Sequence, residues 1–355
     1  MEPNAFSSKT SPAYLRLYEQ LRRRIIQGSY PYGARFPSKR QTAEEENLSL
    51  VTVEHAYALL CDEGYLASRE RSGYYVLFRD SDGFVPAPVQ PRPIPHHDPT
   101  PADFPFSVLA RTMRRVLSEY GEAILERCPN PGAPELRLAL AQYLGRSRGI
   151  HVTPEQILVG SGAEYLYGLI VQALGRDRLY AAEDPSYEKI VQVYRAHGAE
   201  CELLPLGQDG IRSDALARSR ASVLHITPYR SFPSNVTATA AKRHEYIRWA
   251  SEPDRFLVED DVTSEFTPSS KPEETVFSLS SLGNVIYLNT FSQTVAPSLR
   301  MGYLVLPETL LPLFQERVGF YACTVPLYEQ YVLAEFLRSG DYERHIRRVR
   351  RMLRK

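Results

Sequence analysis

The sequence predicts an α/β protein with two domains, a small N-terminal helical domain and a larger domain built on a mostly parallel sheet. Three observations lead to this prediction. The chain has 355 residues, of which 43% are hydrophobic, so it can form more than one packed core. Eight prolines lie between Phe84 and Phe106, which excludes a helix there and favours an extended spacer. Short apolar runs then alternate with helical segments, as in a sheet covered by helices on both faces.

The spacer divides the chain into three segments. We expect the N-terminal domain at residues 1–79, the proline-rich linker at residues 80–104 and the large domain at residues 105–355. The charges of the 42 basic and 42 acidic residues cancel, so a surface that binds a polyanion has to come from a local group of basic residues. The four cysteines are far apart in sequence and no long apolar run is present. We therefore expect a cytoplasmic protein without a structural disulfide, a metal site or a membrane span.

Three helices are predicted in the N-terminal domain. Apolar residues keep helical spacing over residues 12–27. Ser38 is followed three residues later by Gln41, a capping-box pattern that begins a second helix. Ser49 begins a third helix, which Gly64 ends.

A hairpin follows the third helix. Residues 65–68 and 74–78 alternate apolar and polar side chains, which predicts two strands around a short turn at residues 69–73. Three helices followed by such a hairpin form a winged helix-turn-helix, an arrangement typical of DNA-binding domains. The third helix would enter the major groove, and the hairpin tip would meet the backbone or the minor groove.

Seven short apolar runs predict the strands of the larger domain. They lie at residues 157–159, 179–183, 201–205, 223–227, 256–259, 285–289 and 302–306. Helices are predicted near residues 162–174, 187–197, 239–251 and 327–338. In mostly parallel sheets, ligands bind at the carboxyl ends of the strands.

Polar residues follow three of these strands. Gly160–Ala163 leads from a strand into a helix, where backbone N–H groups can bind a phosphate, although many ordinary tight turns look the same. Glu259–Asp261 offers carboxylates that suit a protonated ring nitrogen or, equally well, a helix or turn cap. The hydroxyl groups of Thr290–Thr294 and the guanidinium of Arg300 suit a phosphate dianion.

The segment PYGARFPSKRQTAEEENLSLVTVEHAYALLCDEGYLASRERSGYYV resembles the winged helix-turn-helix of GntR-type repressors. Their pattern has a PxGxxLPSxR segment, a Ser/Thr-capped recognition helix and a glycine in the wing. By this resemblance the residues that contact double-stranded operator DNA are Arg35, Ser38, Lys39, Arg40, Ser49, Thr52, Glu54, Arg69 and Gly73. One departure is that Leu50 and Val51 occupy the place where the family commonly has an arginine. Fewer charges there would lower the affinity or alter the preferred base step.

From about Phe104 onward the chain resembles the fold-type I aminotransferase domain of MocR-type regulators, the GntR subgroup with a half that binds pyridoxal 5′-phosphate. The segments that carry this resemblance are PNPGAPELRLALAQYLGRSRGI, EDPSYEKI, VEDDVTSEF and NTFSQTVAPSLRMGYLVLP. The resemblance implies a phosphate cup formed by Ser161, Gly162, Ala163, Thr290, Ser292 and Arg300. Asp260 would pair with the pyridine nitrogen, and Tyr187 or Tyr165 would stack on the ring.

Four residues in three segments depart from that family around the same ligand. Gln293 stands where the family has the lysine that binds the cofactor, and a carboxamide cannot form an imine because its nitrogen is not a nucleophilic amine. Val262 replaces a tyrosine, and Arg230 and Ser231 replace a His-Gln pair. Aminotransferase chemistry also needs that lysine to move a proton. We therefore expect no covalent cofactor and no enzymatic activity.

The leading hypothesis is a homodimeric DNA-binding transcription regulator whose aminotransferase-like domain senses a small-molecule effector. Pyridoxal phosphate, where it binds, would be held non-covalently. Related sequences continue beyond Lys355, so the C-terminal subdomain is expected to be incomplete. The alternatives are a pocket for another anionic metabolite with Arg230 and Arg300 as counter-charges, a Gln293 substitution in an ordinary cofactor-binding regulator, an aminotransferase-like enzyme with residual activity, and a module that binds only proteins.

Overall fold

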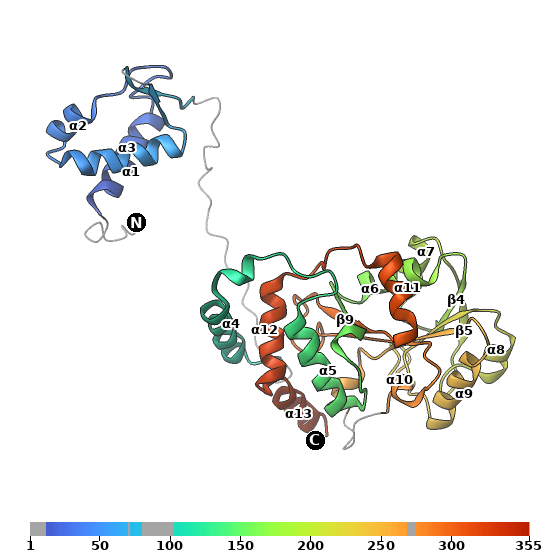
Figure 1. Cartoon of the computed structure of the whole chain (residues 1–355). Helices are drawn as coiled ribbons and strands as arrows, with labels where there is room; N and C mark the ends of the chain where they lie inside the picture. Colours follow the sequence, from blue (N-terminus) through green and yellow to red (C-terminus); the bar gives the residue numbers. More distant parts are fainter. Residues whose placement is uncertain (1–11, 70–71, 80–102, 268–273, 355) are drawn as a thin grey trace. The chain divides into compact units, whose positions relative to one another are not determined.

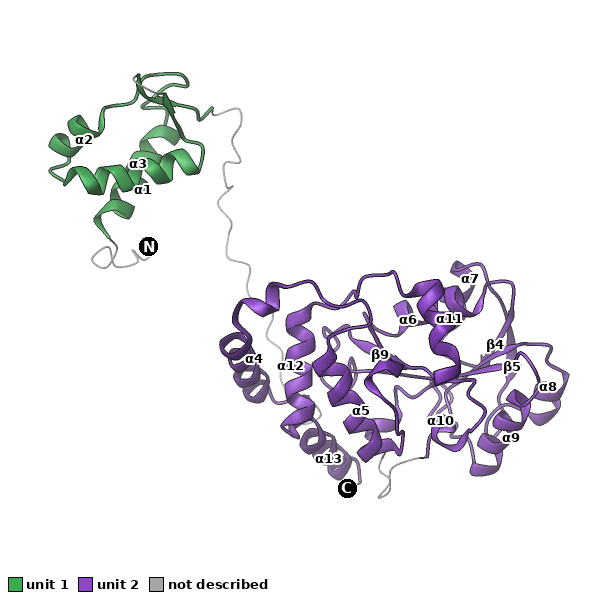
Figure 2. Cartoon of the chain, viewed as in Figure 1, with its two compact units in different colours: residues 1–96 green, residues 97–355 purple. Residues whose placement is uncertain are grey.

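The computed structural model describes residues 12–69, 72–79, 103–267 and 274–354. The chain divides into two compact units, residues 1–96 and residues 97–355 (Figure 2). The linker expected at residues 80–104 lies outside the described residues, apart from Asp103 and Phe104.

In its described residues the N-terminal unit has three helices and an antiparallel hairpin (Figure 1). These elements are α1 (Ala13–Ile26), α2 (Lys39–Glu45), α3 (Leu50–Asp62), β1 (Leu66–Arg69) and β2 (Gly73–Val76). The predicted helices and hairpin are confirmed, with small differences at their ends. Two residues of the hairpin tip, Glu70 and Arg71, lie outside the described residues.

Serine side chains begin α2 and α3, as predicted. Ser38 Oγ accepts a hydrogen bond from the Gln41 N–H at 3.2 Å, and Ser49 Oγ accepts one from the Thr52 N–H at 3.2 Å. The second half of the predicted capping box is not formed. The Gln41 amide donates instead to Glu45 Oε1 at 2.9 Å, because a carboxylate one turn ahead lies on the same helix face.

Tyr57 of α3 joins the parts of the N-terminal unit at their centre. Its buried ring packs against Phe36 and Tyr74, with ring centres 5.6 and 5.0 Å away. Its hydroxyl donates to the Pro37 carbonyl at 3.0 Å and lies 2.7 Å from Thr42 Oγ1. One side chain therefore holds α3 against both α2 and the hairpin.

The second unit is built on a seven-stranded sheet in the order β3-β9-β8-β7-β6-β4-β5. The strands are β3 (Ile157–Gly160), β4 (Leu179–Asp184), β5 (Glu200–Pro205), β6 (Val223–Ile226), β7 (Phe256–Asp260), β8 (Val285–Thr290) and β9 (Gly302–Val305). β9 runs antiparallel to β3 and β8, whereas the other neighbouring pairs are parallel. The predicted strands and the mostly parallel sheet are confirmed.

Helices connect and cover these strands. They are α4 (Phe106–Tyr120), α5 (Pro134–Arg148), α6 (Ala163–Leu174), α7 (Glu188–Ala196), α8 (Ser213–Arg218), α9 (Ala240–Ala250), α10 (Val276–Leu279), α11 (Leu311–Val318), α12 (Leu327–Arg338) and α13 (Asp341–Leu353). The helices predicted from the sequence correspond to α6, α7, α9 and α12. The remaining helices were not predicted.

Alternate side chains of a strand face opposite layers of helices. In β8, Ile286 and Leu288 belong to the core formed with α6, α7 and α11. Tyr287 points the other way, into the core formed with α5, α12 and α13. Val285 shares that face and packs with α9 and α10. Helices therefore cover both faces of the sheet and leave its strand ends free for a site.

The first prediction concerns Tyr57. Tyr57→Phe is expected to lower the free energy of unfolding of the N-terminal unit by ~1–3 kcal/mol, since a buried carbonyl and a buried hydroxyl lose a partner. Denaturant unfolding followed by circular dichroism measures the change. Tyr32→Phe is the matched control, because Tyr32 is 50% exposed. Equal unfolding midpoints for Tyr57→Phe and the parent chain would contradict this role of the hydroxyl.

Candidate functional site

A cavity of about 320 Å³ lies at the carboxyl ends of β7 and β8, beside the start of α6. This volume is in the range of small-molecule sites. Its lining consists of Ala163, Glu164, Tyr167, Tyr187, Ile190, Thr227, Phe232, Asp260, Val262, Thr263, Thr290, Ser292, Gln293 and Arg300. Of the nine residues expected to bind a cofactor, seven are in this lining, so the structure brings most of the expected site together.

One end of the cavity combines hydroxyl groups, a guanidinium and a helix start. Thr290 Oγ1 and Ser292 Oγ lie 3.1 Å apart. α6 begins at Ala163, and the first N–H groups of a helix have no partner within it, which favours an anion there. Gly162 precedes the helix with φ of 94°, and a Cβ on it would lie 3.4 Å from Arg300 Nη2. Glycine at this position therefore lets the guanidinium approach the helix start.

Two expected residues, Ser161 and Gly162, are next to the cavity but not in its lining. The Ser161 N–H donates to Thr324 Oγ1 at 3.1 Å, so another part of the chain already uses this donor. Of the two candidates for stacking on a ring, Tyr187 lines the cavity and is 40% exposed, whereas Tyr165 does not line it.

Glu164, on the first turn of α6, was not predicted as a site residue. Its Oε2 lies 3.7 Å from Arg300 Nη2, and its Oε1 accepts a hydrogen bond from Lys189 Nζ. The carboxylate therefore neutralises part of the positive charge that would face an anion. The hydrogen bond to Glu164 also raises the pKa of Lys189, which keeps that amine protonated.

Asp260, at the end of β7, is buried and held by polar groups around it. The Tyr167 hydroxyl donates to Asp260 Oδ2, and the Val262 N–H donates to Oδ1 at 3.3 Å. His225 Nε2 lies 3.5 Å from Oδ2, and His225 Nδ1 lies 2.6 Å from the Tyr194 hydroxyl. Tyr167, His225 and Tyr194 were not predicted from the sequence. Their contacts fix the carboxylate in the cavity wall, where it can pair with a cationic nitrogen.

The two neighbouring carboxylates have other partners. Glu259 accepts hydrogen bonds from the N–H groups of Val276 and Phe277, both at 2.8 Å. Burial and the nearby charge of Asp261 raise the pKa of Glu259 to about 8. Glu259 therefore caps the start of α10, whereas Asp260 lines the cavity, and its pairing with a ring nitrogen stays a prediction.

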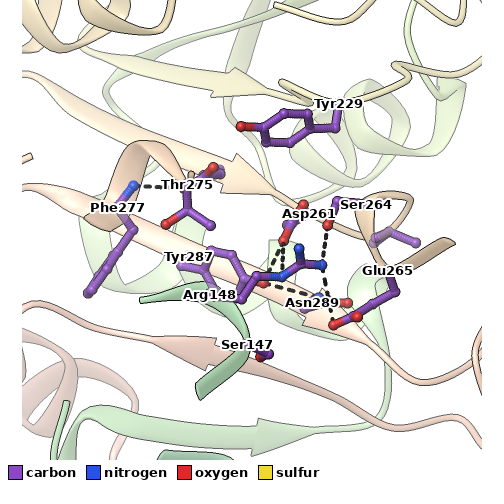
Figure 3. A network of polar contacts seen from close by, with 12 residues as sticks. Ser147, Arg148, Tyr229, Asp261, Ser264, Glu265, Thr275, Phe277, Tyr287 and Asn289 are labelled. Carbon is purple, nitrogen blue, oxygen red and sulfur yellow. Dashed lines mark hydrogen bonds and ion pairs between the residues drawn. The ribbon is translucent and has the colours of Figure 1, made fainter. Parts of the chain in front are cut away.

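Asp261 belongs to a buried ionic network around Arg148 of α5 (Figure 3). Arg148 Nε lies 3.4 Å from Asp261 Oδ2, and Arg148 Nη2 lies 3.3 Å from Glu265 Oε1. The Tyr287 hydroxyl donates to Asp261 Oδ2 at 2.7 Å. The Arg148 side chain is only 1% exposed. Arg148 therefore fixes the segment after β7, which carries Val262 to the cavity.

Gln293 is exposed and is part of the cavity lining. Val262 lines the cavity as well. Among the residues that the structure describes, no lysine is part of this lining. Lys189 reaches Glu164 at the edge of the cavity, and Lys242 is buried against Glu245 at 2.8 Å.

Arg230 does not line the cavity, so it does not supply the positive charge that was expected there. It is exposed and has φ of 49°. The next residue, Ser231, is buried, and its hydroxyl donates to Glu183. Because Ser231 is anchored inward, the turn directs Arg230 toward solvent.

The residues expected to bind DNA are exposed or partly exposed on α2, on α3, in the segments that precede these helices and on the hairpin. They are Arg35, Ser38, Lys39, Arg40, Ser49, Thr52, Glu54, Arg69 and Gly73. Lys39 Nζ lies 3.1 Å from Glu54 Oε1, so two of them pair with each other across α2 and α3. Leu50 and Val51, at the start of α3, are 42% and 60% exposed. An apolar surface therefore lies where the third helix would meet base edges.

The hairpin adds cations to this surface. The Arg69 guanidinium lies 4.4 Å from the centre of the Tyr75 ring. Gly73 has φ of 107°, which favours glycine, and Arg35 Nε would lie 3.6 Å from a Cβ at this position. Arg35 and Arg69 thus both lie near the tip end of the hairpin, beside Gly73 and Tyr75.

The described part of the chain has neither of two other kinds of site. No three His, Cys, Asp or Glu side chains of the described residues gather as a metal ion would require. None of its described helices combines the length and the apolar content needed to cross a membrane. All four cysteines are free thiols.

Comparison with known proteins identifies both parts of the chain. The family model for aminotransferase class I and II matches residues 102–355, and the model for bacterial regulatory proteins of the gntR family matches residues 13–76. The chain is 31% identical to the uncharacterized HTH-type transcriptional regulator YdeL of Bacillus subtilis (strain 168), over 97% of this chain and 77% of that protein. It is also 31% identical to the probable rhizopine catabolism regulatory protein MocR of Rhizobium meliloti, over 96% and 75%.

A solved structure of similar fold is LysN, the α-aminoadipate aminotransferase of Thermus thermophilus, complexed with N-(5′-phosphopyridoxyl)-L-leucine. The TM-score is 0.62 and the sequence identity 29%, over 70% of this chain and 64% of that one. This chain therefore spans less than two thirds of the length of the solved aminotransferase.

The second prediction concerns Arg148. Arg148→Ala is expected to lower the free energy of unfolding of the second unit by ~3–5 kcal/mol, because Asp261 is left as a buried charge without a cation. Glu265 keeps a weaker partner, Arg350, at 3.8 Å. Denaturant unfolding followed by the fluorescence of the single tryptophan, Trp249, reports on this unit.

The matched control for this prediction is Arg146→Ala on the same helix. The Arg146 side chain is 57% exposed and pairs with Glu343 at the surface, so its loss is expected to cost ~0–1 kcal/mol. If both variants lowered the free energy of unfolding by the same small amount, the buried network would not stabilise the unit.

Proposed function

This chain belongs to the HTH-type transcriptional regulators in which a gntR-family domain precedes an aminotransferase class I and II domain, and on that premise we propose that the second domain is a sensor. Its ligand is pyridoxal phosphate or a pyridoxal–amino acid adduct, held without a covalent bond. Binding shifts the relative placement of two DNA-binding domains in a homodimer. The observation that carries this proposal is the cavity that combines Arg300, Thr290, Ser292 and Asp260 with an amide, Gln293, in place of an amine.

The groups in the cavity suit a phosphorylated pyridine. Arg300 and the hydroxyls of Thr290 and Ser292 would hold the phosphate together with the first N–H groups of α6. Asp260 would pair with the ring nitrogen, and Tyr187 would stack on the ring. Such a cofactor supplies an electron sink to an enzyme that also provides an amine base.

The same cavity does not suit catalysis. The Gln293 amide neither bonds to an aldehyde nor takes up a proton near neutral pH. Lys189 contacts Glu164 of the lining, and its hydrogen bond to that carboxylate holds the pKa of its ammonium above the usual value. A protonated amine is not a nucleophile. Among the described residues, the cavity therefore has groups for binding and no amine for turnover.

The adduct named for the Thermus thermophilus enzyme supports this ligand class. In N-(5′-phosphopyridoxyl)-L-leucine the pyridoxyl carbon is bonded to the nitrogen of leucine. A ligand of this kind needs no lysine in order to stay in a site of that fold. We extend this to the present chain as part of the proposal.

A second candidate is a smaller anionic metabolite. Arg300 and Lys189 face one carboxylate, Glu164, so the charges near the phosphate end sum to one positive charge. A monoanionic carboxylate would match that charge as well as a phosphate does. Competition between pyridoxal phosphate and simple carboxylates for the cavity would separate the two ligand classes.

The N-terminal domain would bind paired half-sites of an operator. Two-fold symmetry of a dimer would set the half-site spacing. Arg35, Ser38 and Lys39 would contact phosphates, which orient the domain without reading sequence. Leu50 and Val51 would add apolar contacts in the major groove, where the thymine methyl group is the complementary partner.

The third prediction tests the amide at position 293. Gln293→Lys is expected to allow covalent capture of pyridoxal phosphate, because a lysine there can bond to the aldehyde. After borohydride reduction, mass spectrometry should find a pyridoxyl group on residue 293 of the variant and on no residue of the parent. Gln293→Met, which has neither amide nor amine, is the control. A reduced pyridoxyl group on any side chain of the parent chain would end the proposal of non-covalent binding.

The fourth prediction tests DNA recognition. Arg40→Ala is expected to weaken binding to a duplex from the chain's own upstream region by ~1–3 kcal/mol if Arg40 contacts a base, and to lower the salt dependence if it contacts a phosphate. Gel retardation at several salt concentrations distinguishes the two. Arg23→Ala on α1, where the side chain is 72% exposed, is the control. Unchanged binding and an unchanged salt slope would move the DNA-binding surface elsewhere.

A further inference from the structure

Two of the four cysteines, distant in sequence, are neighbours in the second unit. Cys128 lies in the loop before α5, and Cys323 lies in the loop before α12. The amide nitrogen of Gln330, on α12, lies 3.1 Å from Cys128 Sγ and 3.4 Å from Cys323 Sγ. Both thiols are partly exposed, whereas Gln330 is fully buried. One buried amide therefore holds two accessible sulfurs side by side.

The two thiols are not equivalent. A hydrogen bond from Cys323 lowers the pKa of Cys128 to about 7, and the Gln330 amide contributes in the same direction. The same hydrogen bond, together with burial, raises the pKa of Cys323. Cys128 is therefore the more acidic of the two thiols, and Cys323 is the one that stays protonated beside it. This is the arrangement of an attacking and a resolving cysteine.

The other two cysteines lack these features. Burial raises the pKa of Cys201 to about 11, and burial raises the pKa of Cys61 as well. Neither is bonded to a second thiol in its described contacts. Cys61 and Cys201 therefore serve as controls within the same chain, because they are expected to react more slowly than Cys128.

We propose that Cys128 and Cys323 form a dithiol that a hydroperoxide oxidises to an intramolecular disulfide. The Cys128 thiolate attacks one peroxide oxygen, the O–O bond breaks, and the leaving oxygen takes a proton and departs as water or an alcohol. Cys128 is then a sulfenic acid. The Cys323 sulfur, losing its proton, displaces hydroxide from Cys128 and forms the S–S bond, and this hydroxide leaves as water. The two thiols lose two electrons and the peroxide gains them.

Both loops are attached to β3, the strand that leads to the cavity. The Val159 N–H donates to the Pro131 carbonyl at 2.9 Å, and Cys323 Sγ lies 3.7 Å from the Val159 carbonyl. The residue after Cys323, Thr324, accepts the hydrogen bond from the Ser161 N–H. An S–S bond of about 2.05 Å is much shorter than a contact between two thiols, so its formation displaces these loops.

Displacement of Thr324 changes the availability of the Ser161 N–H, one of the groups expected in the phosphate cup. Oxidation is therefore expected to change the affinity of the cavity for pyridoxal phosphate by about fivefold, the effect of one hydrogen bond. This coupling rests on the proposed function, whereas disulfide formation does not.

The experiment uses the full chain, reduced, desalted and treated with hydrogen peroxide at pH 7. Titration of thiols in denaturant is expected to fall from four to two, and a peptide map without reductant is expected to show a cross-link between Cys128 and Cys323. A count that stays at four, or a cross-link that includes Cys61 or Cys201, would overturn the proposal.

Two variants at one position separate the reactive pair from simple proximity. Cys323→Ala removes the hydrogen-bond donor, so the alkylation rate of Cys128 by iodoacetamide at pH 7 is expected to fall about fivefold to tenfold, after allowing for the greater nucleophilicity of a more basic thiolate. Cys323→Ser keeps a donor and is expected to retain most of that rate, yet it cannot form the disulfide. Equal rates in parent and Cys323→Ala would contradict the role given to Cys323.

The coupling is measured separately, by titrating pyridoxal phosphate into the reduced and the oxidised chain. A changed affinity on oxidation supports the coupling to Ser161. An unchanged affinity, with the cross-link present, overturns the coupling alone. Absence of binding in both states counts against the proposed function and leaves the dithiol standing.

Discussion

The register between β7 and β8 determines which carboxylate of the acidic run meets which partner. Asp260 pairs with Leu288 in this register, and side chains alternate between the two faces of the sheet. Asp260 therefore meets Tyr167 of α6 in the cavity wall, and Asp261 meets Arg148 on the opposite side. A slip of one residue would exchange these faces. It would bury one carboxylate without a cation and place the other beside the wrong helix, so the cavity and the core depend on the same alignment.

The cavity brings together groups that bind charge. Arg300, Thr290 and Ser292 converge near the start of α6, and Asp260 is oriented by Tyr167. These groups bind charge and need no amine to do so. In a regulator that does not turn its ligand over, no reaction consumes the bound ligand. Such behaviour suits a sensor, because a bound state lasts until the ligand dissociates.

Much of the fold could be predicted because its signals are local. Apolar runs gave the strands of the second unit, and Ser38 and Ser49 gave the starts of α2 and α3. The location of the site followed from topology, since polar residues after parallel strands meet at one edge of the sheet. α13 was missed because its apolar residues, such as Tyr342 and Ile346, are sparse among many arginines.

The contacts that could not be predicted are those that depend on packing at a distance. The position of Glu164 next to Arg300 depends on the rotation of α6 relative to the loop before β9, which no local pattern specifies. Tyr167 and His225 lie in apolar segments and look like core residues until Asp260 is placed beside them. The exposed direction of Arg230 follows from the burial of Ser231, and Cys128 and Cys323 meet only through the fold.

The ion pair between Lys39 and Glu54 affects how the N-terminal domain would respond to salt. A lysine already neutralised by its own protein releases few counterions on reaching a phosphate, and leaves its former carboxylate facing a polyanion. Association with a duplex should then depend less steeply on ionic strength than the number of exposed cations suggests, so a larger share of the affinity would come from contacts with bases.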